Sequence, residues 1–126
     1  MGWADVIRGA NTPAGPSGAG GDDNTIWFCY RGAADRVCEY STIDLSEIRS
    51  QVSPGNYPTG IGGNANVIYH SDPIEDRLYE LDPSDFSVVH IQISHDTHPS
   101  GIGGDEDYIW HCDNAANRVY ELNRNL

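Results

Sequence analysis

Two histidines in the chain are spaced in a way that is compatible with metal binding. His70 lies two residues before Asp72, and His111 lies two residues before Asp113. Residues two apart on a strand point to the same face, so each pair could offer a metal an imidazole and a carboxylate. A histidine placed in a packed strand is more often satisfied by internal hydrogen bonds. We therefore expect a structural role for both, with metal binding as the alternative.

A second histidine cluster, His95, Asp96 and His98, lies in the polar segment SHDTHPSG. These residue types can bind a metal, but no second element supplies the remaining ligands of a tetrahedral site. We interpret the segment as a solvated loop.

Carboxylates gather in the turns of the chain. Oxygen ligands of this kind suit Ca²⁺, but the ligand spacing of a calcium loop is missing. The sequence predicts an acidic, solvated rim. Its members are Asp22, Asp23, Asp44, Asp82, Asp85, Asp105, Glu106 and Asp107.

The three cysteines offer no nucleophile. Their odd number leaves at least one thiol outside any intrachain disulfide, and Cys29, Cys38 and Cys112 are interpreted as small buried residues. No serine lies in a G-x-S-x-G or S-x-x-K context. The sequence predicts no enzyme activity and no cofactor.

These residues belong to a repeat of 41 or 42 residues that runs through the chain. Gly18, Gly60 and Gly101 occupy one position of the repeat. Each copy begins with a glycine-rich segment and continues with short runs rich in β-branched and aromatic residues, separated by turn formers. We expect four strands per copy and no helix. The strands expected after the glycine-rich segments are 26–29, 36–40, 45–52, 68–71, 77–81, 86–93, 109–112 and 118–122.

The two ends of the chain are offset by one strand. Residues 3–8 align with the fourth strand of a copy, and residues 118–122 form a third strand that no fourth one follows. This offset is typical of a β-propeller, in which strands from both ends complete one blade. The sequence predicts a single half-propeller domain over residues 1–126, with repeats at 17–58, 59–99 and 100–126 plus 3–16.

The repeat P-x-G-I-G-G-D…I-W-H-C-D…N-R-V-Y-E-L resembles the blade of the NHL-type six-bladed propellers. It differs from them in having Gly-Gly where Ala-Val is usual. The resemblance implies that Asp72 with Arg77, and Asp113 with Arg118, brace a turn and tie neighbouring blades through charge-assisted hydrogen bonds.

Three blades are fewer than the four to eight of known propellers. A half-ring would expose aromatic and aliphatic blade faces that water does not favour, so we expect a homodimer with six blades. Trp3 and Val6 of one chain would complete the blade of its partner next to Val119 and Leu122. The alternative is an excerpt of a longer, natural or engineered array.

The formal net charge is −12, with seven arginines and no lysine. This charge argues against nucleic-acid and membrane partners. No signal peptide or transmembrane segment is recognisable, and the free thiols favour an intracellular protein. We expect a non-enzymatic scaffold that binds a protein or glycan at its rim loops or channel mouth. A lectin, using Trp27, Tyr69 or Trp110 as stacking platforms, and a metal-dependent hydrolase or lactonase are the alternatives.

Overall fold

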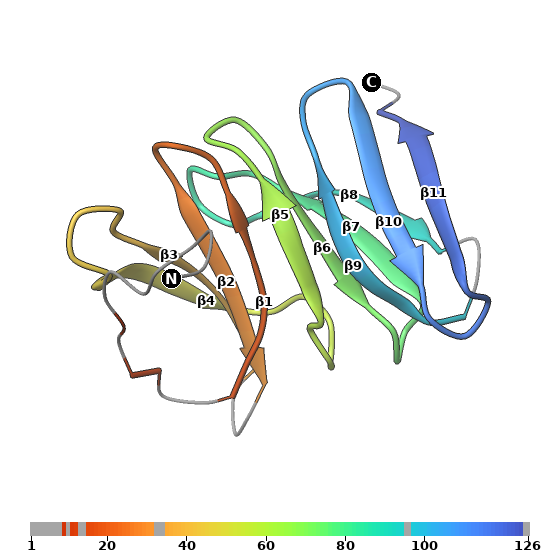
Figure 1. Cartoon of the computed structure of the whole chain (residues 1–126), viewed down its shortest axis with the longest axis horizontal. Helices are drawn as coiled ribbons and strands as arrows, with labels where there is room; N and C mark the ends of the chain where they lie inside the picture. Colours follow the sequence, from red (N-terminus) through yellow and green to blue (C-terminus); the bar gives the residue numbers. More distant parts are fainter. Residues whose placement is uncertain (1–8, 10, 13–14, 32–34, 95–96, 125–126) are drawn as a thin grey trace, which may run out of the picture.

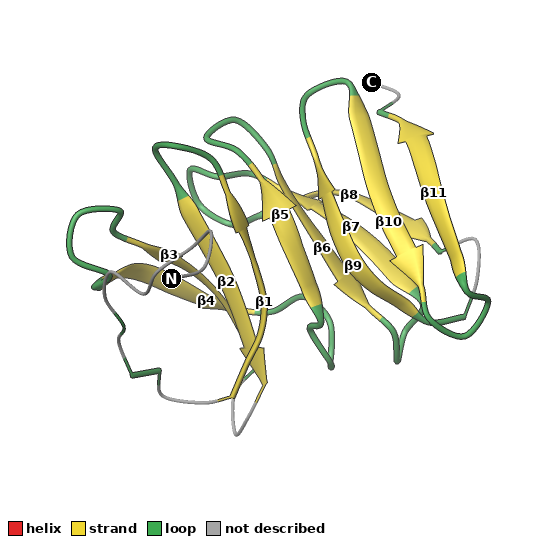
Figure 2. Cartoon of the chain, viewed as in Figure 1, coloured by secondary structure: helices red, strands yellow, loops and turns green. Residues whose placement is uncertain are grey.

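A computed structural model describes residues 9, 11–12, 15–31, 35–94 and 97–124 (Figure 1). Trp3 and Val6, on which the expected ring closure depends, lie outside this part of the chain. All regular structure in the described part is β-strand (Figure 2), and none of it is a helix long and apolar enough to cross a membrane. The strands are β1 (Gly15–Gly21), β2 (Ile26–Arg31), β3 (Arg36–Tyr40), β4 (Glu47–Val52), β5 (Gly60–Gly63), β6 (Ile68–Asp72), β7 (Arg77–Leu81), β8 (Val88–Ile93), β9 (Pro99–Gly104), β10 (Tyr108–Asp113) and β11 (Arg118–Asn123).

The strands form three antiparallel sheets, one for each copy of the repeat. Blade I has the order β1-β2-β3-β4 and blade II the order β5-β6-β7-β8, while blade III consists of β9, β10 and β11. The first strands of the blades, β1, β5 and β9, lie next to one another, and the blades fan out from them (Figure 1). This is the blade arrangement of a β-propeller, as the sequence predicts.

The core fills the junctions between consecutive blades. Strand register places Trp27, Cys29 and Val37 on the face of blade I that meets blade II. They form one buried cluster with Ile68 and Leu81 of blade II. Because successive side chains of a strand alternate between faces, blade II contributes one face to blade I and the other face to blade III.

Strands β3 and β7 coincide with the expected third strands of their blades. Strands β4 and β8 each begin two residues later than expected. Leu45 and Phe86 have φ values of 58° and 61°, in the left-handed region that bulky residues rarely adopt. Each closes a turn, because its backbone N–H donates to the carbonyl oxygen four residues earlier, that of Ser41 and of Asp82 respectively. Strands β4 and β8 therefore begin only after these turns.

Glycines let the first strands of neighbouring blades approach closely. A Cβ placed on Gly18 would lie 2.8 Å from the carbonyl oxygen of Thr59, and one on Gly62 would lie 2.6 Å from that of Ile102. These distances are shorter than a real Cβ contact allows. The glycines of the repeat are therefore required at these positions by the neighbouring blade.

Candidate functional site

One aromatic position of the repeat differs sharply between the blades. Trp27 and Tyr69 are each only 1% exposed, whereas Trp110 is 44% exposed. The Trp27 indole N–H donates to the carbonyl oxygen of Asn64 in the next blade at 3.2 Å, and the Tyr69 hydroxyl donates to that of Asp105 at 2.6 Å. Both side chains thus fasten their own blade to the following one. In blade III the Trp110 indole donates instead to Glu121 of its own blade, at 2.9 Å.

Trp110 belongs to what we call the open face of blade III. This sheet face has Gly101, Gly103, Trp110, Cys112 and Val119 along its strands, and a hollow of about 530 Å³ lies over it. Val119 is 83% exposed, although the equivalent Val37 of blade I is fully buried under blade II. Leu122, which the sequence grouped with Val119, alternates to the other face and lines the cleft towards blade II.

At the other end of the row, blade I turns a face away from blade II. Register places Ala19, Ile26 and Phe28 on this face. A hollow of about 230 Å³ lies on it, lined by Pro16, Ser17, Gly18, Ala19 and Phe28. No described strand outside blade I packs on this face. Its outer part, with Tyr30, Cys38 and Tyr40, is nevertheless buried within the chain. We call it the leading face of blade I.

His70 is held as a neutral structural side chain. Its Nδ1 lies 2.9 Å from the carbonyl oxygen of Gly60 and its Nε2 lies 2.8 Å from Oγ of Ser53. The carbonyl can only accept, so Nδ1 carries the proton and Nε2 accepts from the Ser53 hydroxyl. The ring stacks on Tyr79, and burial lowers the pKa of His70 to about 4. The sequence did not single out Ser53, 17 residues away.

His111 occupies the equivalent position in blade III and stacks on Tyr120, with ring centroids 5.0 Å apart. Both histidines lie on the face that meets the preceding blade, with Asp72 and Asp113 on the same faces. Nowhere among the described residues do three His, Cys, Asp or Glu side chains come together in a way that could hold a metal ion.

Asp72 braces its blade by accepting hydrogen bonds from backbone N–H groups rather than from an arginine. The buried Asp72 carboxylate accepts the N–H groups of Tyr57, Ile74 and Glu75 at 2.8–3.1 Å. Arg77 stands opposite Asp72 in the ladder, but the ion pairs of the described residues do not include it.

Asp113 repeats this arrangement with the N–H groups of His98, Ala115 and Ala116 at 2.7–2.9 Å. Burial acts to raise the pKa of Asp113, but these hydrogen bonds outweigh it and hold the pKa below its usual value. Arg118 lies over the ring of Tyr120 instead of pairing with Asp113. Each aspartate thus braces its turn through charge-assisted hydrogen bonds to backbone amides, and the ion pairs of the described residues include neither Arg77 nor Arg118.

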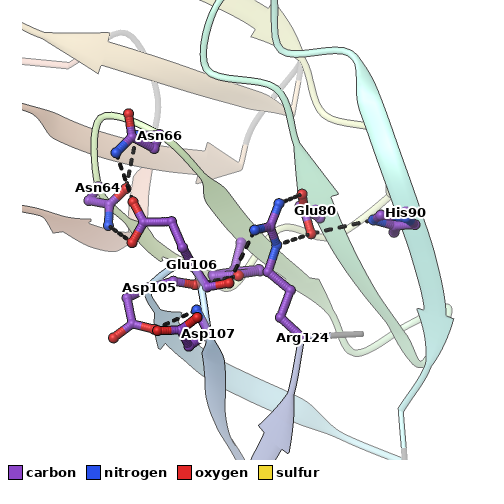
Figure 3. A network of polar contacts seen from close by, with 9 residues as sticks. Asn64, Asn66, Glu80, His90, Asp105, Glu106, Asp107 and Arg124 are labelled. Carbon is purple, nitrogen blue, oxygen red and sulfur yellow. Dashed lines mark hydrogen bonds and ion pairs between the residues drawn. The ribbon is translucent and has the colours of Figure 1, made fainter. Parts of the chain in front are cut away.

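A polar network crosses the junction between blades II and III (Figure 3). Arg124 donates to both carboxylate oxygens of Glu80, at 3.0 and 2.8 Å, and to the carbonyl oxygen of Glu106 at 3.1 Å. The arginine holds the pKa of Glu80 below its usual value, and His90 approaches the same carboxylate at 3.4 Å. Bidentate pairs of this kind position two elements as well as stabilising them.

Side-chain hydrogen bonds also join the rim turns of blades II and III. Glu106 of blade III accepts from Asn64 at 3.3 Å and from Asn66 at 2.8 Å, both of blade II (Figure 3). At the junction of blades I and II, Arg49 makes the corresponding contact. It pairs with Glu39 of its own blade and donates to the carbonyl oxygen of Ser84 in blade II at 2.6 Å. Each junction therefore has its own charged tie.

Replacing Arg124 by glutamine should lower the free energy of unfolding by about 2 kcal/mol, the usual size of a lost charged hydrogen bond. A double-mutant cycle with Glu80→Gln, measured by urea unfolding, should give a coupling energy of similar size. Arg118→Gln is the matched control and should change stability by less than about 0.5 kcal/mol. Additive effects of the two substitutions would contradict the assigned tie.

The acidic residues of the rim hold their own turns. Asp22 Oδ1 accepts from the N–H groups of Asn24 and Thr25 at 2.8 and 2.9 Å, and Asp105 Oδ1 does the same within its turn. Hydrogen bonds of this type lower the pKa values of these carboxyls. The turn carboxylates thus have a structural use. Lowered pKa values are also found for Asp44 and Asp85.

The three cysteines are free thiols. Cys29 pairs across the ladder with Val37, while Cys38 pairs with Phe28, so the two sulfurs lie on opposite faces of blade I. Burial raises the pKa of each of these two thiols to about 11. Cys112 is half-buried on the open face of blade III and is the most accessible of the three.

The described part of the chain is a row of β-propeller blades, and comparison with known proteins agrees. No family model and no curated protein matches the sequence. Among solved structures, glutaminyl cyclase of Myxococcus xanthus is similar with a TM-score of 0.68 at 12% identity, over 86% of this chain and 47% of that one. Kluyveromyces lactis Hsv2 is similar with a TM-score of 0.68 at 12% identity, over 88% of this chain and 33% of that one.

AztD from Citrobacter koseri is also similar, with a TM-score of 0.58 at 12% identity, over 86% of this chain and 44% of that one. The chain therefore spans less than half the length of each of these propeller-type proteins. One of them is named as an enzyme, and the names of the other two state no activity. The likeness concerns the fold, and a fold does not determine function.

Proposed function

We propose that the chain is a half-ring that self-assembles into a closed, six-bladed propeller of NHL type and serves as a non-enzymatic binding module. The observation that carries this proposal is the contrast between Trp27, buried under the next blade, and Trp110, exposed at the same repeat position. An exposed aromatic and aliphatic blade face is costly in water. A second copy supplies the three blades that cover it.

The number of chains in the ring rests on the six blades of the propellers that the repeat resembles, because the lengths of the similar structures differ. One copy spans 47% of the glutaminyl cyclase and 44% of AztD but 33% of Hsv2. A two-fold axis closes such an assembly.

The proposed binding role rests on where the repeat varies. The turns that begin with Asp22, Asn64 and Asp105 share one conformation, each closed by the same backbone hydrogen bond, but differ in their side chains. The strands that lead to the axis carry glycines rather than the carboxylates and histidines that a propeller hydrolase would need. The burial of Trp27 and Tyr69 also removes two of the three stacking platforms of the lectin alternative. A ligand would therefore be recognised by the rim loops or the channel mouth.

Size-exclusion chromatography with light scattering tests the assembly. The chain has a mass of 13.8 kDa, and we expect about twice this mass at micromolar concentration. A mass of one chain over that range would contradict the closed ring. A glycan array distinguishes a lectin from a protein-binding module, and metal analysis of the purified protein tests the hydrolase alternative.

A further inference from the structure

We propose that the ring closes head to tail, with the open face of blade III docked on the leading face of the partner's blade I. The Trp110 indole would then leave Glu121 and donate to the backbone carbonyl of the partner's Asp22. This inference rests on the proposed ring assembly and goes further by assigning the two surfaces and their contacts. The arrangement repeats the two junctions already present within the chain.

The glycines of the inner strands provide the first argument. A Cβ on Gly20 would lie 2.6 Å from the Cα of Gly62, and a Cβ on Gly62 would lie 2.8 Å from that of Gly103. These two glycines are thus required by the strand of the next blade. Gly103 holds the same repeat position, yet a Cβ there would meet nothing within 4 Å, and its φ is not positive. Nothing within the described chain requires glycine at position 103, whereas a first strand docked in trans would.

The aromatic position provides an independent second argument. Trp27 and Tyr69 each donate across a junction to the backbone carbonyl of the residue that follows the Gly-Gly pair of the next blade, Asn64 and Asp105 respectively. In blade I that residue is Asp22. Trp110 has the same ring position and a free path to such an acceptor, because its side chain is 44% exposed.

The part of the leading face that would receive Trp110 is the hollow along its inner strand, because the outer part of this face is already buried within the chain. This hollow lies along β1 and is lined by Ser17, Gly18 and Ala19 among others. Ala19 occupies the repeat position of Ile61, which is buried against Trp27 in the junction of blades I and II. The partner's Trp110 would approach Ala19 in the same way. Continuity with the two existing junctions thus favours a second copy of this chain as the occupant.

Hydroxyl groups extend the same pattern along the axis. Ser17 Oγ donates to the carbonyl oxygen of Pro58 at 2.7 Å, and Thr59 Oγ1 lies 3.4 Å from that of Pro99. Ser100 occupies the equivalent position in blade III, which no described blade follows. In the docked pair it would donate to the carbonyl of the partner's Pro16.

Gly103→Leu tests the docking directly. The variant should fold, because the space beside Gly103 is empty in the single chain, and light scattering should show the mass of one chain where the unaltered protein is a dimer. Ala116→Leu adds the same side chain to an exposed turn of blade III and should remain dimeric. Trp110→Ala is the second variant, and we expect it to raise the dimer dissociation constant about 30-fold, as for a central aromatic contact.

Cysteine labelling gives a readout that does not depend on mass. Cys112 lies on the open face, so a thiol reagent should modify it slowly in the dimer and at least about 10-fold faster in Gly103→Leu. The buried Cys29 and Cys38 should stay unmodified in both proteins and report that the fold is intact.

A mixing experiment distinguishes head-to-tail docking from contact between two open faces. Ala19→Glu places a carboxylate on the leading face and should also give single chains, because the charge would be buried without a partner. Mixing Ala19→Glu with Gly103→Leu restores one intact junction, so the mixture should recover dimers. A dimeric Ala19→Glu protein, or a mixture that stays monomeric, would overturn the proposed docking. A monomeric unaltered protein would instead overturn the proposed ring itself.

Discussion

Gly62→Ala should lower the free energy of unfolding by about 3 kcal/mol or more, which is at the upper end for overpacking a core. A Cβ on Gly62 would lie 2.6 Å from the carbonyl oxygen of Ile102 and 2.8 Å from the Cα of Gly103. Both are backbone atoms of β9, so no side-chain rotation relieves the clash, and blades II and III would have to separate. Thermal unfolding followed by circular dichroism should show a midpoint about 10 °C lower.

The control for this prediction is the same substitution one blade further along. Gly103→Ala has the same repeat position but open space beside it, so it should leave the stability of the single chain nearly unchanged. Both substitutions are best compared in the Ala19→Glu background, where assembly does not contribute to the measured stability. Equal losses in the two variants would show that glycine is needed there for a reason other than the neighbouring blade.

Lowering the pH from 7 to 4 should destabilise the protein by about 3 kcal/mol through His70 alone. Burial lowers the pKa of His70 from 6.5 to about 4. Between pH 6.5 and 4, His70 is therefore protonated in the unfolded chain but mostly neutral in the folded chain. The stability that neutral His70 contributes is fully present above pH 6.5 and is lost progressively as the pH falls towards 4.

The His70→Phe variant isolates this contribution. Phenylalanine is the residue that blade I carries at the equivalent position, Phe28. The variant should be less stable at pH 7, because Ser53 and the Gly60 carbonyl lose their partner, but its stability should depend much less on pH between 6.5 and 4.5. His98→Asn, which removes an exposed imidazole, should keep the pH dependence of the unaltered protein. Urea unfolding at each pH measures all three, and an unchanged slope in His70→Phe would contradict the assignment.

The strands and turns within each blade could be predicted from the sequence alone. The bounds of β3 and β7 follow from short β-branched and aromatic runs between turn formers, and the expected turns at Asp22 and Asp105 are each closed by a backbone hydrogen bond. These features are local, since a strand or turn depends on residues within a few positions of one another. The repeat made them more certain, because the same pattern occurs three times.

Contacts between blades could not be read in the same way. Ser53 reaches His70 across 17 residues, and Arg124 reaches Glu80 across 44. Asp72 and Asp113 bind backbone amides, where the family resemblance implied arginine. A single sequence says which side chains can form hydrogen bonds but not which distant groups the fold brings within reach.

Trp27 and Trp110 show this division most clearly. The repeat gives both the same strand position and the same face, with an isoleucine before each and a cysteine two residues after it, so the sequence assigns them one environment. The tertiary structure buries the first and leaves the second 44% exposed. The physical reason is that burial is a property of the next blade, and the part of the chain that the structure describes places no blade beyond Trp110.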